Sequence, residues 1–431
     1  MIPKPTQIEG AKFLAARKHA LLADEPRVGK TGAAIMAADM LGLRKILVIT
    51  TASGRAVWRR AWPEWCPTGY TTKVVTKAAE YDPAINVTVT GWPNVISPDL
   101  RSRLLRETFD LLILDESHYA KSMDTKRTQA VLGRDAAIAS RSERVWYLTG
   151  TPIPHSPADL YPMLRFSFPD LIGGMDADDF LHRYCVVRMK QISQWNRIPV
   201  VIGGKNLEEL RERIAPIMLR RTQADVGIQP PIFDIMPLVA PSRELAALEK
   251  DIDKRAILEA AREGRTKELD VHLGPLRRLT GEIKATAAVA AVKEAFECGL
   301  DKIVLMAWHK DAIRILAEGL KDFGVVVLDG STSPKEREAA ETLFREEKDC
   351  RAFIGQIVAA GEAIDLSAAA ELWFVETSFT PKDLKQAALR VTNHNQTRQA
   401  LVRVCALEGS IDEAIQASLL RLVSTIREVI G

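Results

Sequence analysis

The sequence predicts an α/β protein with two lobes, each built on a parallel β-sheet, and a helical insert between them. Two observations predict this class. Short apolar runs rich in Val, Ile and Leu alternate with helical stretches in both halves of the chain, which is typical of strands buried on both faces and joined by crossover helices. Between the halves, this strand signal gives way to long helical stretches. The expected strands are 45–50, 85–90, 111–116 and 145–150 in the first half, and 302–307, 325–330, 352–357, 371–376 and 401–406 in the second.

The middle of the chain has a different composition. Residues 166–240 mix Pro, Gly and charged residues and hold little strand signal, whereas 242–265 and 279–299 have the pattern of helices. A further helix is expected near 411–429. The expected domains are a first lobe over 1–165, a linker and helical insert over 166–280, and a second lobe over 281–431.

The bulk composition is that of an ordinary globular protein. With 431 residues, of which 47% are hydrophobic, the chain is long enough for about two to four domains. Its net charge of +3 is too small to indicate a nucleic-acid binder by itself, and it leaves room for a local basic channel. The five cysteines include no close pair, so neither a disulfide framework nor a zinc site is expected. Because no stretch approaches the ~18 apolar residues of a membrane span, we expect a cytoplasmic protein.

The stretch DEPRVGKT, residues 24–31, has the ending of a phosphate-binding loop. It begins with Asp24, where the usual pattern has Gly. The apolar HALLA precedes it and the helical TGAAIMAADML overlaps its end and follows it, which is the strand–loop–helix order that such a loop needs. Gly29 permits close backbone approach, Lys30 can reach the β and γ phosphates, and Thr31 can hold Mg²⁺. The sequence therefore predicts an ATP site.

The stretch LLILDESHYA places Asp115 and Glu116 directly after an apolar run. The end of a parallel strand delivers side chains into the crevice where ligands of open α/β sheets bind. One carboxylate can hold Mg²⁺ and the other can orient and deprotonate the attacking water. We assign the metal to Thr31 and Asp115. An isolated acidic pair would be interpreted as a solvated turn, but a phosphate loop 85 residues upstream of Asp115 favours the catalytic interpretation.

The same residues carry a family resemblance. DESH resembles the DEAH box of superfamily-two helicases, and the resemblance extends in order along the chain to the SNF-type DNA-dependent ATPases, most closely their HARP-like annealing-helicase branch. PTQIEGAKFL resembles the Q motif, in which Gln7 would read adenine. LADEPRVGKT resembles the family's L-A-D-E-M-G-L-G-K-T, with Arg27 in place of the inner Gly. The other matching segments are LVITTASGRAVWRRAWPEW, KSMDTKRTQA, LTGTPIPHSPADLYPML, IMLRRTQADV, LDGSTSPKEREAAETLF and QIVAAGEAIDLSAA.

The resemblance implies two RecA-like lobes that share ATP and Mg²⁺. The first would carry the phosphate loop and the DESH box, and the second would contribute Gly361 and Asp365 to the cleft and Arg390 to catalysis. Arg27 places a further cation in the phosphate loop. The resemblance also implies nucleic-acid contacts on both lobes, at Ser53, Arg55, Lys126, Arg127, Thr128, Ser331, Thr332 and Arg337.

The last motif departs from the family. Where the family has Q-A-E-D-R-x-H-R-I-G-Q, this sequence has QAALRVTNHNQ, so that Arg390 matches the first arginine and Asn393 replaces the second. In the family both arginines reach the γ-phosphate, and such a group can be worth ~10³–10⁵ in rate. Three interpretations are open: Arg390 alone suffices with slower turnover, His394 or Arg398 substitutes, or the chain binds ATP without useful hydrolysis.

The sequence thus predicts an ATP-dependent DNA translocase or helicase-like motor that hydrolyses ATP on duplex or forked DNA, with a separate recognition protein as a further partner. One alternative is a nucleotide-dependent DNA-binding module with little or no hydrolysis, which rests on Asn393. A second alternative is an RNA helicase, which is disfavoured because LTGTP stands in place of the S-A-T motif. The tryptophans at 58, 62 and 65 have the spacing of one helix face, so we expect them in the core rather than stacked on bases.

Overall fold

In the computed structural model, the contacts within the chain divide it into two compact units, Met1–Val226 and Gly227–Gly431, and each unit is considered separately. Residues 166–226, which the sequence assigns to a linker and insert, therefore pack with the first unit; the domain boundaries drawn from the sequence stay a prediction. The described residues are 2–52, 54–66, 69–134, 137–150, 152–153, 156–191, 197–239, 266–357, 364–377, 381–392, 398–410 and 412–417.

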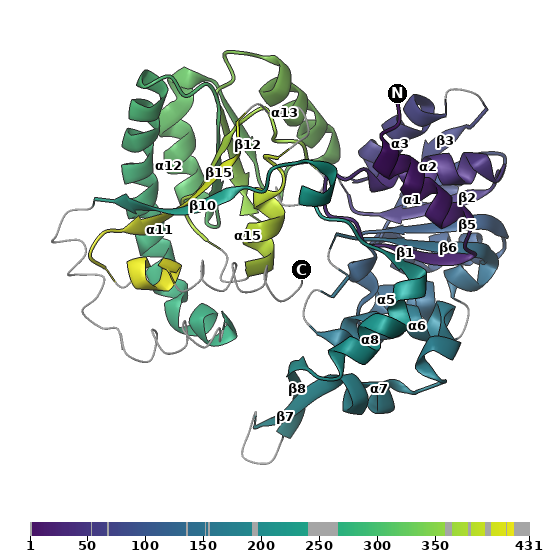
Figure 1. Ribbon diagram of the computed structural model, residues 1–431. Coiled ribbons are helices and arrows are strands. Elements are labelled where there is room, and N and C mark those ends of the chain that lie inside the picture. The colour runs from purple at the N-terminus through teal and green to yellow at the C-terminus, as the bar shows by residue number, and fades with distance from the viewer. Residues whose placement is uncertain are drawn as a thin grey trace. The chain divides into compact units, whose positions relative to one another are not determined.

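The first unit is built on a seven-stranded sheet in the order β3-β4-β2-β5-β6-β1-β9 (Figure 1). Every neighbouring pair of strands in this sheet is parallel. Two of its strands, β3 and β9, have no counterpart among the expected runs. The strands are β1 (His19–Leu22), β2 (Ile46–Thr50), β3 (Thr72–Val74), β4 (Val87–Gly91), β5 (Phe109–Asp115), β6 (Ser142–Leu148) and β9 (Met218–Leu219).

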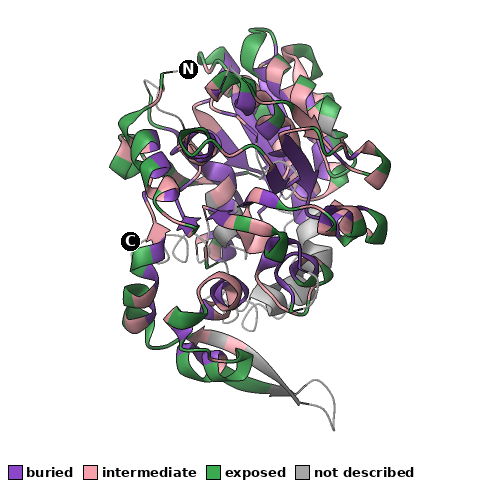
Figure 2. Ribbon diagram, turned by 90° about the vertical axis from the view of Figure 1, so that its right-hand side faces the viewer, coloured by how far each residue is buried: buried purple, intermediate pink, exposed green. Residues whose placement is uncertain are grey.

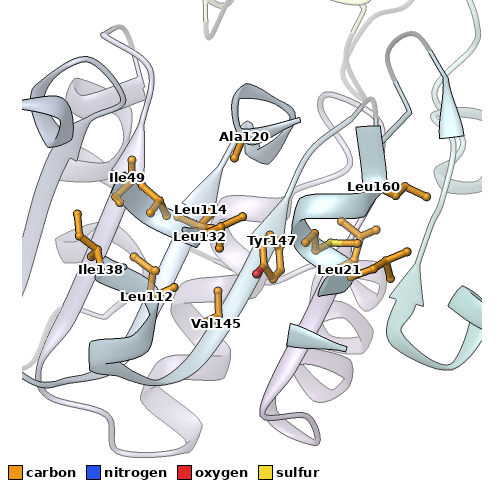
Figure 3. Close-up of a cluster of buried hydrophobic side chains, with 14 of the residues drawn as sticks. Leu21, Ile49, Leu112, Leu114, Ala120, Leu132, Ile138, Val145, Tyr147 and Leu160 are labelled. Atoms are coloured by element: carbon orange, nitrogen blue, oxygen red, sulfur yellow. The ribbon is translucent and has the colours of Figure 1, made fainter. Parts of the chain in front are cut away.

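Apolar residues bury both faces of this sheet, which explains why its strands appear in the sequence as continuous hydrophobic runs. In β5, Leu112 and Leu114 belong to the core on one face, whereas Leu111 and Ile113 belong to the core on the other. Figure 3 shows the first of these cores, with Tyr147 of β6 among the packed side chains. In Figure 2 the inner strands of this sheet are coloured mainly as buried, as the burial of every residue in β2 and β4 requires. The helices of the first unit are α1 (Pro5–Ala15), α2 (Lys30–Met40), α3 (Gly54–Trp65), α4 (Pro98–Leu105), α5 (Lys126–Leu132), α6 (Tyr161–Ser167), α7 (Ala177–Tyr184) and α8 (Leu207–Ile214).

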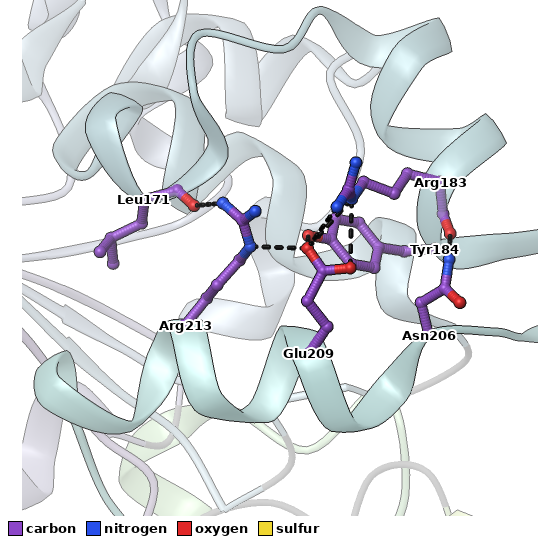
Figure 4. A network of polar contacts seen from close by, with 6 residues as sticks. All are labelled: Leu171, Arg183, Tyr184, Asn206, Glu209 and Arg213. Atoms are coloured by element: carbon purple, nitrogen blue, oxygen red, sulfur yellow. Dashed lines mark hydrogen bonds and ion pairs between the residues drawn. The ribbon is translucent and has the colours of Figure 1, made fainter.

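An antiparallel hairpin of β7 (Cys185–Gln191) and β8 (Arg197–Gly204) projects from the first unit between α7 and α8 (Figure 1). Its base is fastened by Glu209 of α8, whose carboxylate accepts hydrogen bonds from Arg183, Tyr184 and Arg213 (Figure 4). The sequence did not predict this hairpin, because its strands mix charged residues, Gly and Pro with the apolar ones.

The second unit contains a six-stranded sheet in the order β10-β15-β14-β11-β13-β12, again with parallel neighbours throughout. Five of its strands match the five expected runs, and β10 is additional. Two separate all-parallel sheets with helices confirm the predicted α/β class with two lobes. The strands are β10 (Ile232–Leu238), β11 (Ile303–Ala307), β12 (Val325–Leu328), β13 (Ala352–Gln356), β14 (Glu371–Phe374) and β15 (Leu401–Leu407).

The helices of the second unit include a long one, α11, that begins before the helix expected over 279–299. The helix expected over 242–265 lies outside the described residues. Of the helix expected near 411–429, residues 412–417 are described and are helical. Within the described ranges, no helix is both long and apolar enough to cross a membrane. The helices are α11 (Thr266–Glu297), α12 (Lys310–Leu320), α13 (Pro334–Glu346) and α15 (Pro381–Ala388).

Candidate nucleotide-binding and catalytic site

The phosphate loop lies between the end of β1 and the start of α2. Gly29 precedes the first helical residue, Lys30, and has φ 109°, a left-handed conformation that favours glycine. A Cβ at Gly29 would lie 2.5 Å from Nε2 of Gln7, so a side chain at this position would also collide with α1. The loop therefore requires Gly29, and Gln7 of α1 lies beside it.

Arg27 also has a left-handed backbone, with φ 72°. A non-glycine residue pays about 1–2 kcal/mol for this conformation, because its Cβ crowds the neighbouring carbonyl. The related family has glycine at this place, which adopts such a conformation at little cost, so this chain carries a strained cationic residue where the family has glycine.

Lys30 points back into the curl of the loop. Its ammonium donates hydrogen bonds to the main-chain oxygens of Asp24, at 2.6 Å, and of Glu25, at 3.2 Å. The first N–H groups of α2 have no carbonyl partner within the helix and lie at its positive end. A cation inside the curl beside the start of a helix is the donor set that a polyphosphate needs, so these residues fit ATP.

Arg221 holds the loop from the opposite side. Its guanidinium donates to both carboxylate oxygens of Asp24, with Nε 3.1 Å from Oδ1 and Nη2 2.5 Å from Oδ2. The Asp24 side chain is 1% exposed and that of Arg221 is 10% exposed. This pair explains why an acidic residue can stand where most phosphate loops have glycine: its charge is neutralised by a buried partner 197 positions away.

Gln223 completes this contact. Its amide nitrogen Nε2 donates to the main-chain oxygen of Pro26, at 3.0 Å, and its backbone N–H donates to the Glu25 carboxylate, at 2.9 Å. The backbone N–H of Glu25 in turn donates to the oxygen of Arg221, at 2.9 Å. We call residues 221–223 the strap. The role of the strap cannot be read from the sequence, although the resemblance of IMLRRTQADV to the family marks the segment.

Asp115 ends β5 and points into the same region. Its Oδ2 accepts hydrogen bonds from Thr50 Oγ1, at 2.6 Å, and from Trp58 Nε1, at 2.9 Å, and its main-chain oxygen accepts one from Trp92, at 2.9 Å. Neither side-chain bond uses Oδ1. The carboxylate is therefore fixed through Oδ2, and the two bonds to Oδ2 also determine the direction in which Oδ1 points.

The charges around Asp115 oppose one another. Burial, together with the charge of Glu116, raises the pKa of the Asp115 carboxyl, whereas its bonds from Thr50 and Trp58 and the charge of Lys30 act to lower it. The pKa rises overall, because desolvation is the largest of these effects. A cation at this carboxylate would relieve the repulsion from Glu116, so the residues fit the Mg²⁺ of a nucleotide complex.

Mg²⁺ in such sites is usually held by one or two carboxylates together with substrate phosphates, rather than by a complete protein cage. This agrees with the described ranges, which contain no group of three or more His, Cys, Asp or Glu side chains placed to hold a metal. Thr31 is the second residue of α2, so the two predicted metal ligands lie at the ends of elements that meet at the carboxyl edge of the first sheet.

Glu116 follows Asp115 in a left-handed conformation, with φ 50° and ψ 50°. Strained backbone at a catalytic position is a recurrent device for aiming a side chain. His118 lies close by, with its Nδ1 3.2 Å from Glu116 Oε2 and 3.0 Å from Thr149 Oγ1. Because Thr149 follows β6, the histidine connects the DESH box with the segment LTGTP.

The predicted residues of the second unit are described in part. Arg390 is 9% exposed, and its main-chain oxygen accepts a bond from the Leu366 N–H at 3.2 Å, so the segments of Arg390 and Asp365 lie together. The Asp365 carboxylate accepts from the N–H and hydroxyl of Ser367, at 3.0 and 2.6 Å. Gly361, Asn393 and His394 lie outside the described residues.

The candidate nucleic-acid contacts of the first unit have different surroundings. Lys126 is exposed at the start of α5, and the Arg127 guanidinium lies over the ring of Tyr119, with its carbon 5.2 Å from the ring centre. Thr128 is buried, and its hydroxyl shares a 2.8 Å hydrogen bond with that of Thr125 at the helix cap. Thr125 is the N-cap residue of α5, because its hydroxyl accepts the backbone N–H of Thr128, and the Thr128 hydroxyl contacts this cap.

Arg55 is half-buried near the start of α3, where burial lowers the pKa of its guanidinium. Ser53 lies outside the described residues. The tryptophans of α3 confirm the expected core placement for two positions, because Trp58 and Trp62 are both 0% exposed.

In the second unit, the candidate contacts form a braced loop. Asp329 accepts hydrogen bonds from the N–H of Ser331, at 2.8 Å, and from its hydroxyl, at 2.5 Å, and lies 3.2 Å from Lys310 Nζ. These bonds hold the pKa of the Asp329 carboxyl well below its usual range. The Arg337 guanidinium donates to the main-chain oxygens of Asp329 and Thr332, both at 3.1 Å. Ser331 is exposed at the surface of this loop.

Comparisons with known proteins agree with this arrangement. The family model for the SNF2-related domain matches residues 6–280, and that for the helicase conserved C-terminal domain matches residues 290–395. The SWI/SNF-related matrix-associated actin-dependent regulator of chromatin subfamily A-like protein 1 of Xenopus tropicalis is 29% identical over 427 residues, covering 95% of this chain and 43% of that protein. The DNA annealing helicase and endonuclease ZRANB3 of Homo sapiens is 26% identical over 441 residues, covering 97% of this chain and 39% of that protein.

A solved structure, the Sulfolobus solfataricus SWI2/SNF2 ATPase core in complex with dsDNA, aligns with a TM-score of 0.47 and 21% identity, covering 100% of this chain and 93% of that one. The chain spans about two fifths of the length of the two relatives named above. The resemblance to the SNF-type ATPases and their annealing-helicase branch, drawn from the motifs, is confirmed by the family models and these relatives. Because the first model covers more than half of the residues, the chain belongs to the SNF2-related family.

Proposed function

We propose that this chain is a DNA-dependent ATPase that uses ATP and Mg²⁺ to move along duplex or forked DNA. The observation that carries the proposal is the phosphate loop of the first unit, in which the Lys30 ammonium lies inside the curl while Asp115 lies at the carboxyl edge of the same sheet. DNA as the partner is supported by the human relative, which is named a DNA annealing helicase and endonuclease.

In the proposed reaction, Lys30 and the N–H groups at the start of α2 hold the β and γ phosphates and neutralise charge that develops on them. Thr31 and Asp115 hold Mg²⁺, which supplies charge neutralisation at the phosphates when it is bound. Glu116 orients the attacking water and accepts its proton. Gln7 borders the adenine. Arg27 adds a cation beside the phosphates.

We assign Arg390, together with Gly361 and Asp365, to the second half of the ATP site. Arg390 would stabilise charge on the γ-phosphate when the two units close on nucleotide. Alternate closing and opening would then shift the grip on one strand, with contacts from Arg55, Lys126 and Arg127 in the first unit. In the second unit the contacts would come from Ser331, Thr332 and the loop braced by Arg337. In the first unit, Ser53 is a further candidate from the sequence.

The proposal is tested by ATP turnover with no nucleic acid, single-stranded DNA, duplex DNA, forked DNA and RNA. Duplex or forked DNA should stimulate turnover strongly, and Lys30→Ala and Glu116→Gln should each abolish it. Lys18→Ala, on the loop before β1, is a matched surface control for Lys30→Ala. Equal turnover with and without every nucleic acid would refute the DNA-dependent activity, and stronger stimulation by RNA would favour an RNA helicase.

A second candidate is a nucleotide-dependent DNA-binding module, and Asn393 favours it because amides carry no charge. In that case ATP would change DNA affinity without turnover, and a triplex strand would not be displaced. A separate recognition protein and a cytoplasmic location remain proposals from the sequence.

A further inference from the structure

Helix α3 connects two parts of the proposed machinery. Its second residue, Arg55, is a proposed nucleic-acid contact, and Ser53 directly precedes its first residue, Gly54. One turn later, Trp58 donates its indole N–H to Oδ2 of Asp115, at 2.9 Å. Trp58 is 0% exposed, so this hydrogen bond is shielded from water. A single helix therefore lies between the proposed DNA surface and the proposed Mg²⁺ ligand.

The second donor to Asp115 depends on the same helix. Thr50, at the end of β2, donates to the same oxygen, Oδ2, at 2.6 Å. Gly54, the first residue of α3, approaches this hydroxyl so closely that a Cβ at Gly54 would lie 2.1 Å from Thr50 Oγ1. A movement of α3 would therefore alter both bonds that set the orientation of Asp115.

From these contacts we infer that α3 couples nucleic-acid binding at its first turn to the orientation of Asp115, with Trp58 as the positioning residue that transmits it. The inference rests on the proposed function. Its physical basis is the directionality of hydrogen bonds, which weaken steeply when the donor moves out of line. DNA bound at the start of α3 would hold the Trp58 indole N–H in place. The Asp115 carboxylate would then be held as well, with its other oxygen, Oδ1, left for the metal.

A bond from a neutral donor to a carboxylate is worth about 10–100-fold in an equilibrium that depends on it. By thermodynamic linkage, the factor by which DNA strengthens Mg²⁺–nucleotide binding must equal the factor by which Mg²⁺–nucleotide strengthens DNA binding. The coupling can therefore be measured by binding alone, without turnover.

The test compares Trp58→Phe with Trp62→Phe. Both residues are 0% exposed tryptophans of α3, and both substitutions remove a similar volume. They differ in one respect: in the described part of the chain, Trp62 Nε1 is buried with no hydrogen-bond partner, whereas Trp58 Nε1 binds Asp115. Trp62→Phe is thus a control for packing damage.

Two quantities are measured for each protein. The first is the Mg²⁺ concentration that half-saturates binding of fluorescent ADP, with and without duplex DNA. The second is the ratio of DNA-stimulated to basal ATP turnover. In the unmodified chain, DNA should lower the half-saturating Mg²⁺ concentration. In Trp58→Phe, that effect and the turnover ratio should both fall by about tenfold or more, while Trp62→Phe keeps both.

The inference is overturned if Trp58→Phe retains both DNA effects within about twofold, or if Trp62→Phe loses them to the same extent. These outcomes differ from failure of the proposed function, in which the unmodified chain shows no response to DNA in either measurement.

Discussion

Arg221 and Asp24 form a buried fork in which two guanidinium nitrogens meet two carboxylate oxygens, at 3.1 and 2.5 Å. Asp24 is the second residue after β1, and Arg221 is the second residue after β9, so the pair joins the ends of two adjacent parallel strands. It sets the path of the chain as it enters the phosphate loop.

Arg221→Ala should destabilise the chain strongly, because it leaves the Asp24 carboxylate buried without its partner. Breaking such a pair costs about 3–5 kcal/mol. The free energy of unfolding of the first unit, from chemical denaturation, measures this loss. Arg211→Ala, on the exposed face of α8, is the matched control and should change it by less than about 0.5 kcal/mol. A loss no larger than the control's would contradict a structural role for the pair.

Arg27→Gly and Arg27→Ala should separate strain from charge at the phosphate loop. Both remove the guanidinium and should weaken ATP binding, if that cation lies beside the phosphates. Glycine also relieves the left-handed strain, which stabilises the folded chain by about 1–2 kcal/mol. Against this, glycine loses more backbone freedom on folding than alanine does, which costs about 0.5–1 kcal/mol. Arg27→Gly should therefore be the more stable variant by roughly 0.5–1 kcal/mol, and ATP affinity measured by calorimetry should fall equally in both. Unchanged affinity would remove Arg27 from the site.

Asn393→Arg should raise ATP turnover, because it restores the second arginine of the family's last motif. The gain should be about tenfold or more, and a complete arginine finger can be worth ~10³–10⁵. Arg390→Ala should abolish DNA-stimulated turnover. The variants His394→Ala and Arg398→Ala test whether either residue has taken over the missing charge. If one of them stops turnover while Asn393→Arg changes nothing, the substitution is already compensated.

Lys126→Ala and Thr128→Val should differ, although the two residues belong to one matching segment. Lys126 is exposed, so its loss should weaken DNA binding similarly for all sequences and lower the salt dependence by about one unit of slope. Thr128 is buried and its hydroxyl is hydrogen-bonded to that of the N-cap residue Thr125, so its loss should reduce thermal stability and leave the salt slope unchanged. Fluorescence anisotropy across a salt series separates the two, and a changed slope for Thr128→Val would contradict a purely structural role for Thr128.

Cys298 should be the one thiol that reacts rapidly in the native chain. It is exposed, whereas the other four cysteines are buried. Burial raises the pKa of Cys405 to about 12 and, with a contribution from Asp39, that of Cys66 to about 11, which keeps both thiols protonated. A chromogenic thiol reagent at pH 8 should modify one group quickly and all five after denaturation. Cys298→Ser should remove the fast phase.

Most of the parallel strands could be predicted from the sequence because they are buried on both faces and appear as apolar runs. The run at 371–376, for example, contains all of β14. The edge strands β3, β9 and β10 are only partly buried and were not predicted. The hairpin of β7 and β8 could not be predicted in the same way. Its apolar residues Val186, Val187 and Met189 are exposed, and they stand among charged residues without forming a continuous apolar run.

The candidate site was predicted where its chemistry is local in sequence. Asp115 and Glu116 lie at the end of a strand run, Lys30 follows one after a short loop, and motif spacing identifies all three. The contacts that hold the site were not predicted, because Arg221 acts on Asp24 across 197 positions and Trp58 acts on Asp115 across 57. Spacing within one motif carries no information about partners so far apart.

The pairing of β1 with β9 also has a consequence for biosynthesis. When the nascent chain has left the ribosome only as far as α8, β9 is the one strand of the first sheet that has not yet emerged. The edge of β1 that pairs with β9 is then unpaired, and the Asp24 carboxylate lacks the counter-charge of Arg221. Native order at the nucleotide loop can be reached only after the strap emerges, so translation must pass residue 223 before the amino-terminal half becomes competent to bind its ligand.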